Sequence, residues 1–144
     1  MAVTKEQLEQ YTAMKIEISK MREDIRAVED SIAKLIEEGT VKDKVYGGDG
    51  GIQGFVIEGF PYGIYERRRK LLQRKRERLL NRENDLIELV EQIEKSIDGI
   101  PDSRDRMVFR KYFIKNETQM QIAREMYMDQ SSVSKIISRY MKLS

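Results

Sequence analysis

A strict seven-residue repeat of apolar side chains runs through residues 4–38, a stretch with neither Pro nor Gly. It consists of two rows offset by three residues: Tyr11, Ile18, Ile25 and Ile32, and Met14, Met21, Val28 and Leu35. Such rows form the seam of a coiled coil, and few other folds require them. Thr4 and Gln7 fit a capping box at the start of a helix, and Gly39 predicts its end. At about 50 Å, this helix is too long to be buried in a small globule.

The next segment, residues 39–63, holds eight of the nine glycines of the chain. Connections between helices usually take about 2 to 8 residues, so a segment of this length needs a structure or a function of its own. Val41–Tyr46 and Ile52–Ile57 could pair as a β-hairpin around Gly47–Gly51. The glycines do not follow the phosphate-binding pattern of a strand, a glycine-rich loop ending in Gly-Lys and a helix, so phosphate binding is not expected here.

A second long helix is predicted from about Ile64 to Asp98, with Gly99 marking its end. Its apolar residues again recur every seven positions, and two more complete the seam in the second half: Tyr65, Leu72, Leu79, Leu86 and Ile93, with Val90 and Ile97. In the first half the companion positions hold Arg69, Arg76 and Glu83. We therefore expect arginine stems to lie along the seam and seal it.

Blocks of charge predict how the two helices pair. Residues 23–38 carry six acids and two bases, residues 67–82 nine bases and one acid, and residues 83–98 six acids and one base. Antiparallel helices would set the acidic end of the first beside the basic start of the second, and flanking opposite charges are how coiled coils select partners. We interpret the basic run as a solvated face balanced in this way. A nucleic-acid patch is the alternative.

The 144 residues include no His, Cys or Trp. This excludes disulfides, thiolate nucleophiles, imidazole bases and zinc sites made of His or Cys. The plentiful acids lie at the spacing of a solvated helix face and do not converge from several elements as a carboxylate metal site requires. The chain begins without an apolar leader and has no run of about 18 apolar residues. We expect a cytoplasmic protein that is not an enzyme, with no cofactor, metal or membrane partner.

The last 46 residues, 99–144, change rhythm and carry nine bases and five acids. Three helix starts are predicted, at Asp102, at Thr118 with Gln121 in a capping box, and at Asp129. The first helix carries the apolar residues Met107, Val108, Tyr112 and Phe113, the second carries Ile122, Ala123 and Met126, and the third has Val133, Ile136, Ile137 and Tyr140 on its inner face. Three helices with short connections describe a helix-turn-helix unit, in which the small Ala123 allows the last two helices to cross closely.

The third of these helices has a predicted outer face of polar residues. They are Gln130, Ser131, Ser134, Lys135, Ser138 and Arg139. A Gln amide can make two hydrogen bonds to adenine, Ser hydroxyls bond to bases or phosphates, and Lys and Arg neutralise phosphate. We predict that Gln130 and Ser134 contact bases, and that Lys135 and Arg139 contact phosphate. The alternative is the polar outer face that any amphipathic helix has.

Residues 101–143 resemble region 4 of bacterial sigma factors and the related helix-turn-helix of small phage-encoded transcription regulators of the RinA/ArpU kind. The best-matching segments are QIAREM and SSVSKII. The resemblance implies an activator that recognises promoter-like double-stranded DNA and contacts RNA polymerase. A charged helical arm and an insert ending in IEGFPY, ahead of such a tail, are also similar to prophage proteins of Gram-positive bacteria. Where the family's turn usually carries Gly, this chain has Tyr127.

These patterns predict an all-α protein. Residues 1–98 would form a long antiparallel coiled-coil hairpin with the Gly-rich insert at 39–63, and residues 99–144 a helix-turn-helix DNA-binding domain. The leading function is a sequence-specific transcription regulator of phage or prophage origin, whose coiled coil dimerises or rigidifies the molecule. A homo-oligomer is expected, most simply a dimer. The alternatives are a DNA-packaging protein like a small terminase subunit, which assembles into rings, and an adaptor that binds RNA polymerase without reading DNA.

Overall fold

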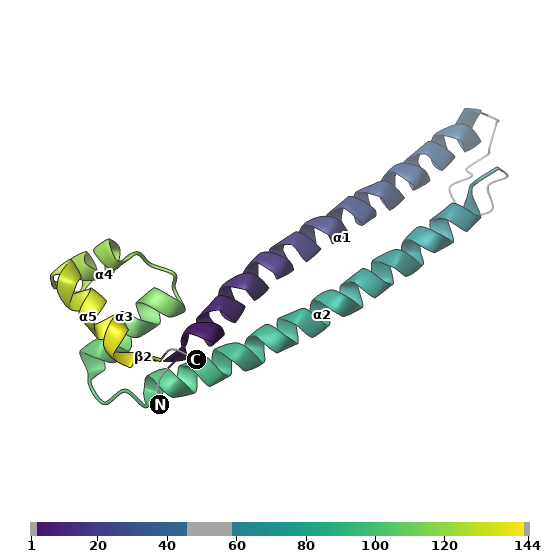
Figure 1. Ribbon diagram of the computed structural model, residues 1–144. Coiled ribbons are helices and arrows are strands. Elements are labelled where there is room, and N and C mark those ends of the chain that lie inside the picture. The colour runs from purple at the N-terminus through teal and green to yellow at the C-terminus, as the bar shows by residue number, and fades with distance from the viewer. Residues whose placement is uncertain (1–2, 46–58, 143–144) are drawn as a thin grey trace. The chain divides into compact units, whose positions relative to one another are not determined.

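The computed structural model describes residues 3–45 and 59–142 (Figure 1). The protein is all-α, as predicted. The elements in chain order are β1 (Val3–Thr4), α1 (Lys5–Val45), α2 (Tyr62–Asp98), α3 (Ser103–Phe113), α4 (Gln119–Glu125), α5 (Gln130–Tyr140) and β2 (Met141–Lys142). Among the helices of this described part, none combines the length and the apolar character that crossing a membrane requires.

Helix α1 begins where the sequence predicted and ends later. The backbone N–H of Gln7 donates to Thr4 Oγ1 at 3.1 Å, and the backbone N–H of Thr4 donates to Gln7 Oε1 at 3.1 Å, which completes the capping box. The predicted stop at Gly39 was wrong, because α1 continues to Val45. A glycine inside a helix costs only about 1 kcal/mol. Gly39 instead permits a close approach, since a Cβ there would lie 2.5 Å from the Phe60 ring.

The predicted β-hairpin in the Gly-rich insert is not formed as expected. Residues 41–45 of its first strand belong to α1. Tyr46, the Gly47–Gly51 turn and the second strand, Ile52–Ile57, lie outside the described residues. Helix α2 starts at Tyr62, two residues before the predicted start, and ends at Asp98 as predicted.

The chain divides into two compact units, which we describe separately. Residues 17–82 form the hairpin unit, and residues 1–16 together with 83–144 form the head unit. The predicted domain boundary between residues 98 and 99 falls inside the head unit. Both long helices contribute to each unit, so a boundary placed at the end of a helix does not describe how the chain packs.

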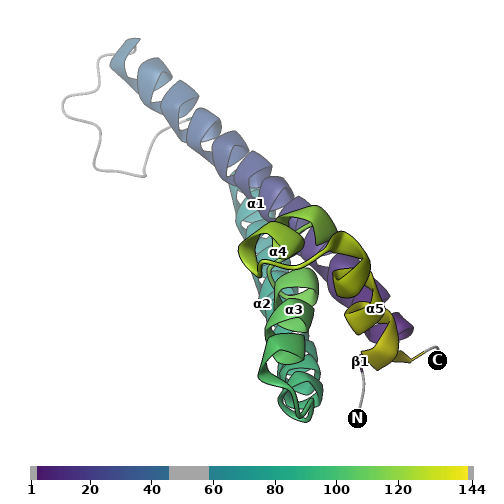
Figure 2. The same ribbon diagram turned by 90° about the vertical axis from the view of Figure 1, so that its left-hand side faces the viewer.

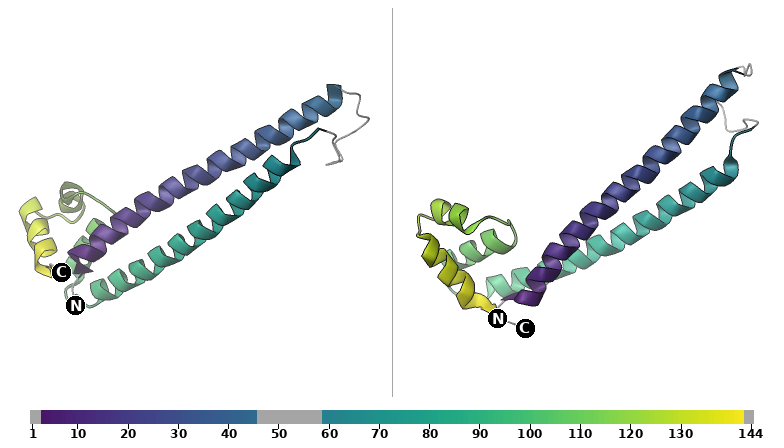
Figure 3. Two further views of the ribbon diagram at one scale, coloured as in Figure 1. Left: turned by 45° about the vertical axis from the view of Figure 1, so that its right-hand side comes forward. Right: turned by 45° about the horizontal axis from the view of Figure 1, so that its top comes forward.

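In the hairpin unit α1 and α2 run side by side in opposite directions (Figures 1 and 3). The contacts between them fix this direction, because residues early in α1 meet residues late in this part of α2. Arg82 Nε lies 3.3 Å from Glu17 Oε1, and Arg76 Nη2 lies 2.9 Å from Glu29 Oε2. The pair of Arg76 and Glu29 joins the predicted acidic and basic blocks, whereas Glu17 lies before the acidic block.

The seam of the hairpin unit differs from the prediction on its α2 side. The apolar residues Tyr65, Leu72 and Leu79 are half-buried there, as expected. The long basic side chains beside them are Arg68 and Lys75, which are half-buried, whereas the predicted Arg69 and Arg76 are exposed. Arg68 Nη1 also donates to the backbone carbonyl of Ser31 at 3.2 Å. Basic stems therefore line the seam three residues after Tyr65 and Leu72 rather than four, whereas Arg82, three residues after Leu79, is exposed.

The head unit contains a continuous hydrophobic core. Helices α3, α4 and α5 cluster around it (Figure 2). Its most completely buried side chains come from α2, α3, α4, α5 and β1: Ile93, Ile97, Val108, Phe109, Phe113, Ile122, Val133 and Val3. Strands β1 and β2 pair in parallel with Val3 opposite Met141, a pairing that the sequence did not predict.

Candidate nucleic-acid interface

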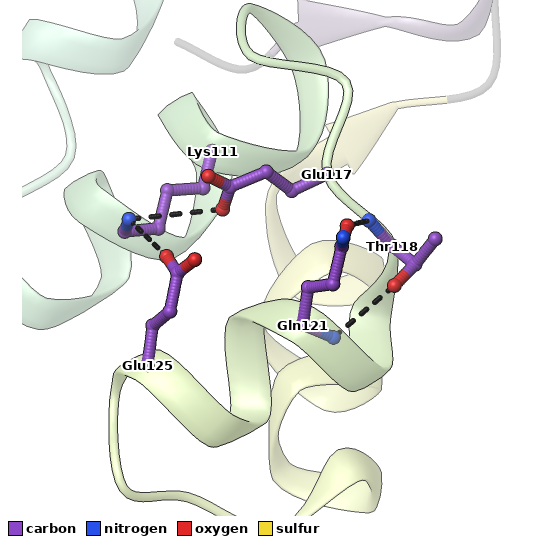
Figure 4. Close-up of polar contacts among 5 residues, drawn as sticks. All are labelled: Lys111, Glu117, Thr118, Gln121 and Glu125. Atoms are coloured by element: carbon purple, nitrogen blue, oxygen red, sulfur yellow. Dashed lines mark hydrogen bonds and ion pairs between the residues drawn. The ribbon is translucent and has the colours of Figure 1, made fainter.

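The three short helices begin at the predicted caps. Asp102 accepts a hydrogen bond from the backbone N–H of Asp105 at 3.1 Å. Thr118 and Gln121 form the reciprocal capping box at 2.9 and 3.1 Å (Figure 4). Asp129 is the N-cap residue of α5 but its side chain makes no capping hydrogen bond. The carbonyl oxygen of Asp129 accepts from Ser132 and Val133 instead, at 3.0 and 3.2 Å.

The turn between α4 and α5 contains a residue with left-handed backbone geometry. Tyr127 has φ 55° and its side chain is 96% exposed. Glycine adopts this conformation freely, whereas a residue with a Cβ pays about 1 to 2 kcal/mol for it. The backbone N–H of Met128 closes the turn by donating to the carbonyl of Ala123 at 2.9 Å. The chain therefore forms this turn with Tyr127 in the left-handed conformation that glycine adopts most readily.

The inner faces of the helices match the prediction except at two positions. Ile122 and Ala123 of α4 and Val133, Ile136 and Ile137 of α5 are buried, as are Val108 and Phe113 of α3. Tyr112, Met126 and Tyr140 are half-buried. Met107, one of the apolar residues of the first predicted helix, does not join them, because its side chain is 48% exposed. The side chain of Phe109 is fully buried in the core instead, because one face of α3 carries Asp105, Val108, Phe109 and Phe113.

The six predicted contact residues lie on α5 away from this core. Gln130, Ser131, Lys135, Ser138 and Arg139 are exposed and Ser134 is half-buried. Ser131 and Lys135 are four residues apart, as are Ser134 and Ser138, so helix geometry sets each pair side by side on the surface. The structure thus brings the polar residues together along one exposed side of an 11-residue helix.

Arg139 differs from the other five because it contacts a buried carboxylate. Its Nη1 lies 3.4 Å from Oδ2 of Asp105, which is 3% exposed. The hydroxyl of Tyr140 donates to the same oxygen at 2.8 Å, and this hydrogen bond, together with burial, raises the pKa of Tyr140. The sequence does not distinguish Asp105, because an acid in the first turn of a helix is explained by the helix dipole alone. In the structure it anchors the last turn of α5 to α3.

Lys111 holds α3 and α4 together (Figure 4). Its Nζ lies 2.5 Å from Glu125 Oε2 and 3.6 Å from Glu117 Oε2. The hydrogen bond between Lys111 and Glu125 raises the pKa of the ammonium and lowers the pKa of that carboxyl. The charge of Lys111 is therefore engaged within the head unit and does not contribute to an anion-binding surface.

Two further arginines adjoin the α4–α5 turn. Arg104 and Arg124 line a surface hollow together with Tyr127, Asp129 and Ser132. Both side chains are exposed, and neither forms an ion pair with another residue that the structure describes. Neither was predicted as a contact residue, because Arg104 lies fifteen residues before the start of α4 at Gln119 and only folding brings it to the turn.

In residues 3–45 and 59–142, no cluster of three or more acidic side chains is placed to hold a metal ion. No protein-family model, curated protein or solved structure matches this chain.

Proposed function

We propose that the head unit binds double-stranded DNA through α5 and that the protein is a sequence-specific transcription regulator. One observation carries this proposal: α5 buries Val133, Ile136 and Ile137 against α3 and α4 while its other side presents Gln, Ser, Lys and Arg to solvent. The second helix of a helix-turn-helix enters the major groove in this way, with its first residues nearest the base edges.

The exposed residues of α5 divide into two roles. Gln130 and Ser134 lie in the first half of the helix, and their amide and hydroxyl groups suit hydrogen bonds to base edges. Lys135 and Arg139 suit phosphate, and so do Arg104 and Arg124 beside the turn. Arg139 reaches phosphate only if its guanidinium turns from Asp105, at 3.4 Å in the free protein.

The biological setting follows from the resemblance to region 4 and to phage regulators. The proposal is an activator that works on phage or prophage promoters in the cytoplasm, contacts RNA polymerase as a second partner and catalyses no reaction. A single helix-turn-helix buries little DNA surface, so nanomolar affinity needs two units on one site. We therefore propose that the protein binds as a homodimer.

The experiment is selection of a preferred site from random duplexes, followed by footprinting and by binding measurements on the selected and scrambled sites across salt. Gln130→Ala should cost about 1 to 3 kcal/mol on the selected site and little on scrambled DNA. Arg139→Ala should weaken both and lower the salt slope by about one. Equal losses for both variants on both duplexes would exclude base readout by Gln130.

The mass in solution and the footprint separate the alternatives. A dimer with a footprint at one site supports the regulator, and a ring with no preferred site supports a packaging protein. Binding to RNA polymerase with no binding to DNA at low salt would leave the adaptor.

A further inference from the structure

Four basic side chains form a row along α2 in the hairpin unit, which we call the α2 basic row. They are Arg67, Lys70, Arg74 and Arg78. All four are exposed, and their spacing of three or four residues sets them on one face of the helix. The half-buried Tyr65, Leu72 and Leu79 mark the side of α2 that faces the seam, and the α2 basic row lies on another side of the helix.

The acidic residues of α1 do not neutralise this row. The ion pairs between the helices use Arg76 and Arg82. No member of the row makes an ion pair or a hydrogen bond to any side chain in the described part of the chain. Within this unit α1 carries eight acidic and six basic residues, whereas α2 carries two acidic and nine basic ones. The predicted balance of charge is therefore met at Arg76 and Arg82 and not along the α2 basic row.

The chemistry of this face selects the kind of partner. Its other exposed side chains include the polar Glu66, Glu77 and Asn81, and the apolar residues beside it are Ile64, which is 39% exposed, and the half-buried Leu71. The core of a protein–protein interface is depleted in charge and enriched in aromatic residues. Three of the four basic side chains are Arg, whose planar guanidinium binds phosphate through two hydrogen bonds. A polyphosphate backbone fits this face better than a protein surface does.

The spacing of the row also fits a nucleic-acid strand. From Arg67 to Arg78 the helix axis extends about 16 Å. One strand of duplex DNA presents about five phosphates over that length.

The two acids on the face are not equivalent, because Glu77 accepts a hydrogen bond from Gln73 Nε2 at 3.4 Å and Glu66 has no contact of this kind with described residues. Four cations against two acids leave an attraction for a line of phosphates.

We propose that the α2 basic row binds the sugar-phosphate backbone of duplex DNA without regard to sequence. This contact is separate from the one assigned to α5 and does not depend on it. The row would add affinity for any duplex, whereas α5 would choose among duplexes.

The test measures binding of the full-length protein to a random-sequence duplex across salt concentrations. The variant neutralises the row: Arg67→Gln, Lys70→Gln, Arg74→Gln and Arg78→Gln. The matched control removes four exposed positive charges from α1: Lys5→Gln, Lys20→Gln, Arg26→Gln and Lys34→Gln. Because each phosphate contact contributes about 0.9 to the slope of log K against log salt, the row variant should lower the slope by about 3 to 4 and the control by much less. Circular dichroism of each variant checks that the helices remain.

Two results would overturn the proposal. One is an equal change of slope in the row variant and the control, which would mean that only net charge matters. The other is an unchanged slope with a change in the mass of the protein in solution, which would assign the row to a second copy of this chain.

The failure of this proposal is distinguishable from failure of the α5 contact. If α5 does not bind DNA, Lys135→Gln leaves the slope unchanged while the row variant still lowers it. If the row does not bind DNA, preference for the selected site and its dependence on Gln130 remain and the row variant keeps the wild-type slope.

Discussion

The hairpin unit and the head unit share two helices but bury very different amounts of them. Among the described side chains of the hairpin unit, only those of Ile18 and Ile25 are 8% exposed or less. Gly39 is also buried but has no side chain. The head unit buries thirteen hydrophobic residues in one cluster. The repeat on α2 passes through both units, yet Leu72 and Leu79 are half-buried and Ile93 and Ile97 are completely buried. A heptad repeat therefore predicts which side faces a partner, while the depth of burial depends on how many further elements cover that side.

The largest expected effect is at the centre of the head unit. Val133 has no exposed surface, so Val133→Asp places a carboxylate where neither water nor a cation reaches it. We expect a loss of more than about 4 kcal/mol in the free energy of unfolding, with loss of DNA binding. Denaturant unfolding followed by tyrosine fluorescence measures it.

Ser131→Asp is the matched control, because it adds the same group to the exposed side of α5. It should change stability by less than about 0.5 kcal/mol. Similar destabilisation by both variants would mean that α5 is not packed as described.

The corresponding change in the hairpin unit should cost less. Ile25 is 8% exposed in a seam between two helices, and a lysine there can extend its ammonium toward water. We expect Ile25→Lys to reduce the free energy of unfolding by about 2 to 3 kcal/mol. Thermal unfolding by circular dichroism measures the effect, and Ala27→Lys, on the exposed side of α1, provides the comparison. If Ile25→Lys reduced the free energy of unfolding as much as Val133→Asp does, the two units would not differ in how deeply they bury these side chains.

A smaller effect, of opposite sign, is expected at the turn of the head unit. The backbone of Tyr127 has φ 55°, and its side chain is almost fully exposed, so packing of the side chain does not offset the backbone strain. Tyr127→Gly should raise the free energy of unfolding by about 1 kcal/mol, because glycine adopts this geometry without the Cβ clash. Tyr127→Ala keeps the Cβ and should give no such gain. Stabilisation by Ala equal to that by Gly would locate the effect in the aromatic ring.

The sequence predicted what local patterns determine. The heptads predicted both long helices, the capping box predicted the start of α4, and apolar spacing predicted the inner residues of α4 and α5. The end of α1 was mispredicted at Gly39, because a glycine is read as a helix stop from local sequence alone, whereas here it allows close contact with Phe60. The β1–β2 pairing and the Asp105–Tyr140 hydrogen bond join residues more than thirty positions apart, and no local pattern encodes such contacts.

The candidate site was likewise predictable from the sequence only in part. The outer residues of α5 followed from helical spacing, since the apolar residues fixed the inner side. The surroundings of Arg139 and Arg104 did not, because only folding brings Asp105 to Arg139 and Arg104 to the turn between α4 and α5. The basic run 67–82 needed the structure most, since the sequence shows its charge but not which members the α1 acids engage.

The smallest expected effect concerns pH and the ion pair between α3 and α4. The hydrogen bond from Lys111 lowers the pKa of Glu125 below its ordinary value of 4.5, so the pair stabilises the fold above that value and loses its contribution as pH falls through the lowered pKa. Glu125→Gln removes this dependence, so wild type should lose slightly more stability than the variant between pH 7 and pH 2. The difference should be small, because the Glu125 side chain is 47% exposed and solvent screens the pair. Denaturant unfolding of both proteins at the two pH values measures it, and parallel losses would show that the contact contributes nothing in solution. The hairpin unit offers the reference at pH 7, since Glu29→Gln removes the partner of Arg76, whose side chain is 58% exposed against 24% for Lys111, and should cost less stability there than Glu125→Gln does in the head unit.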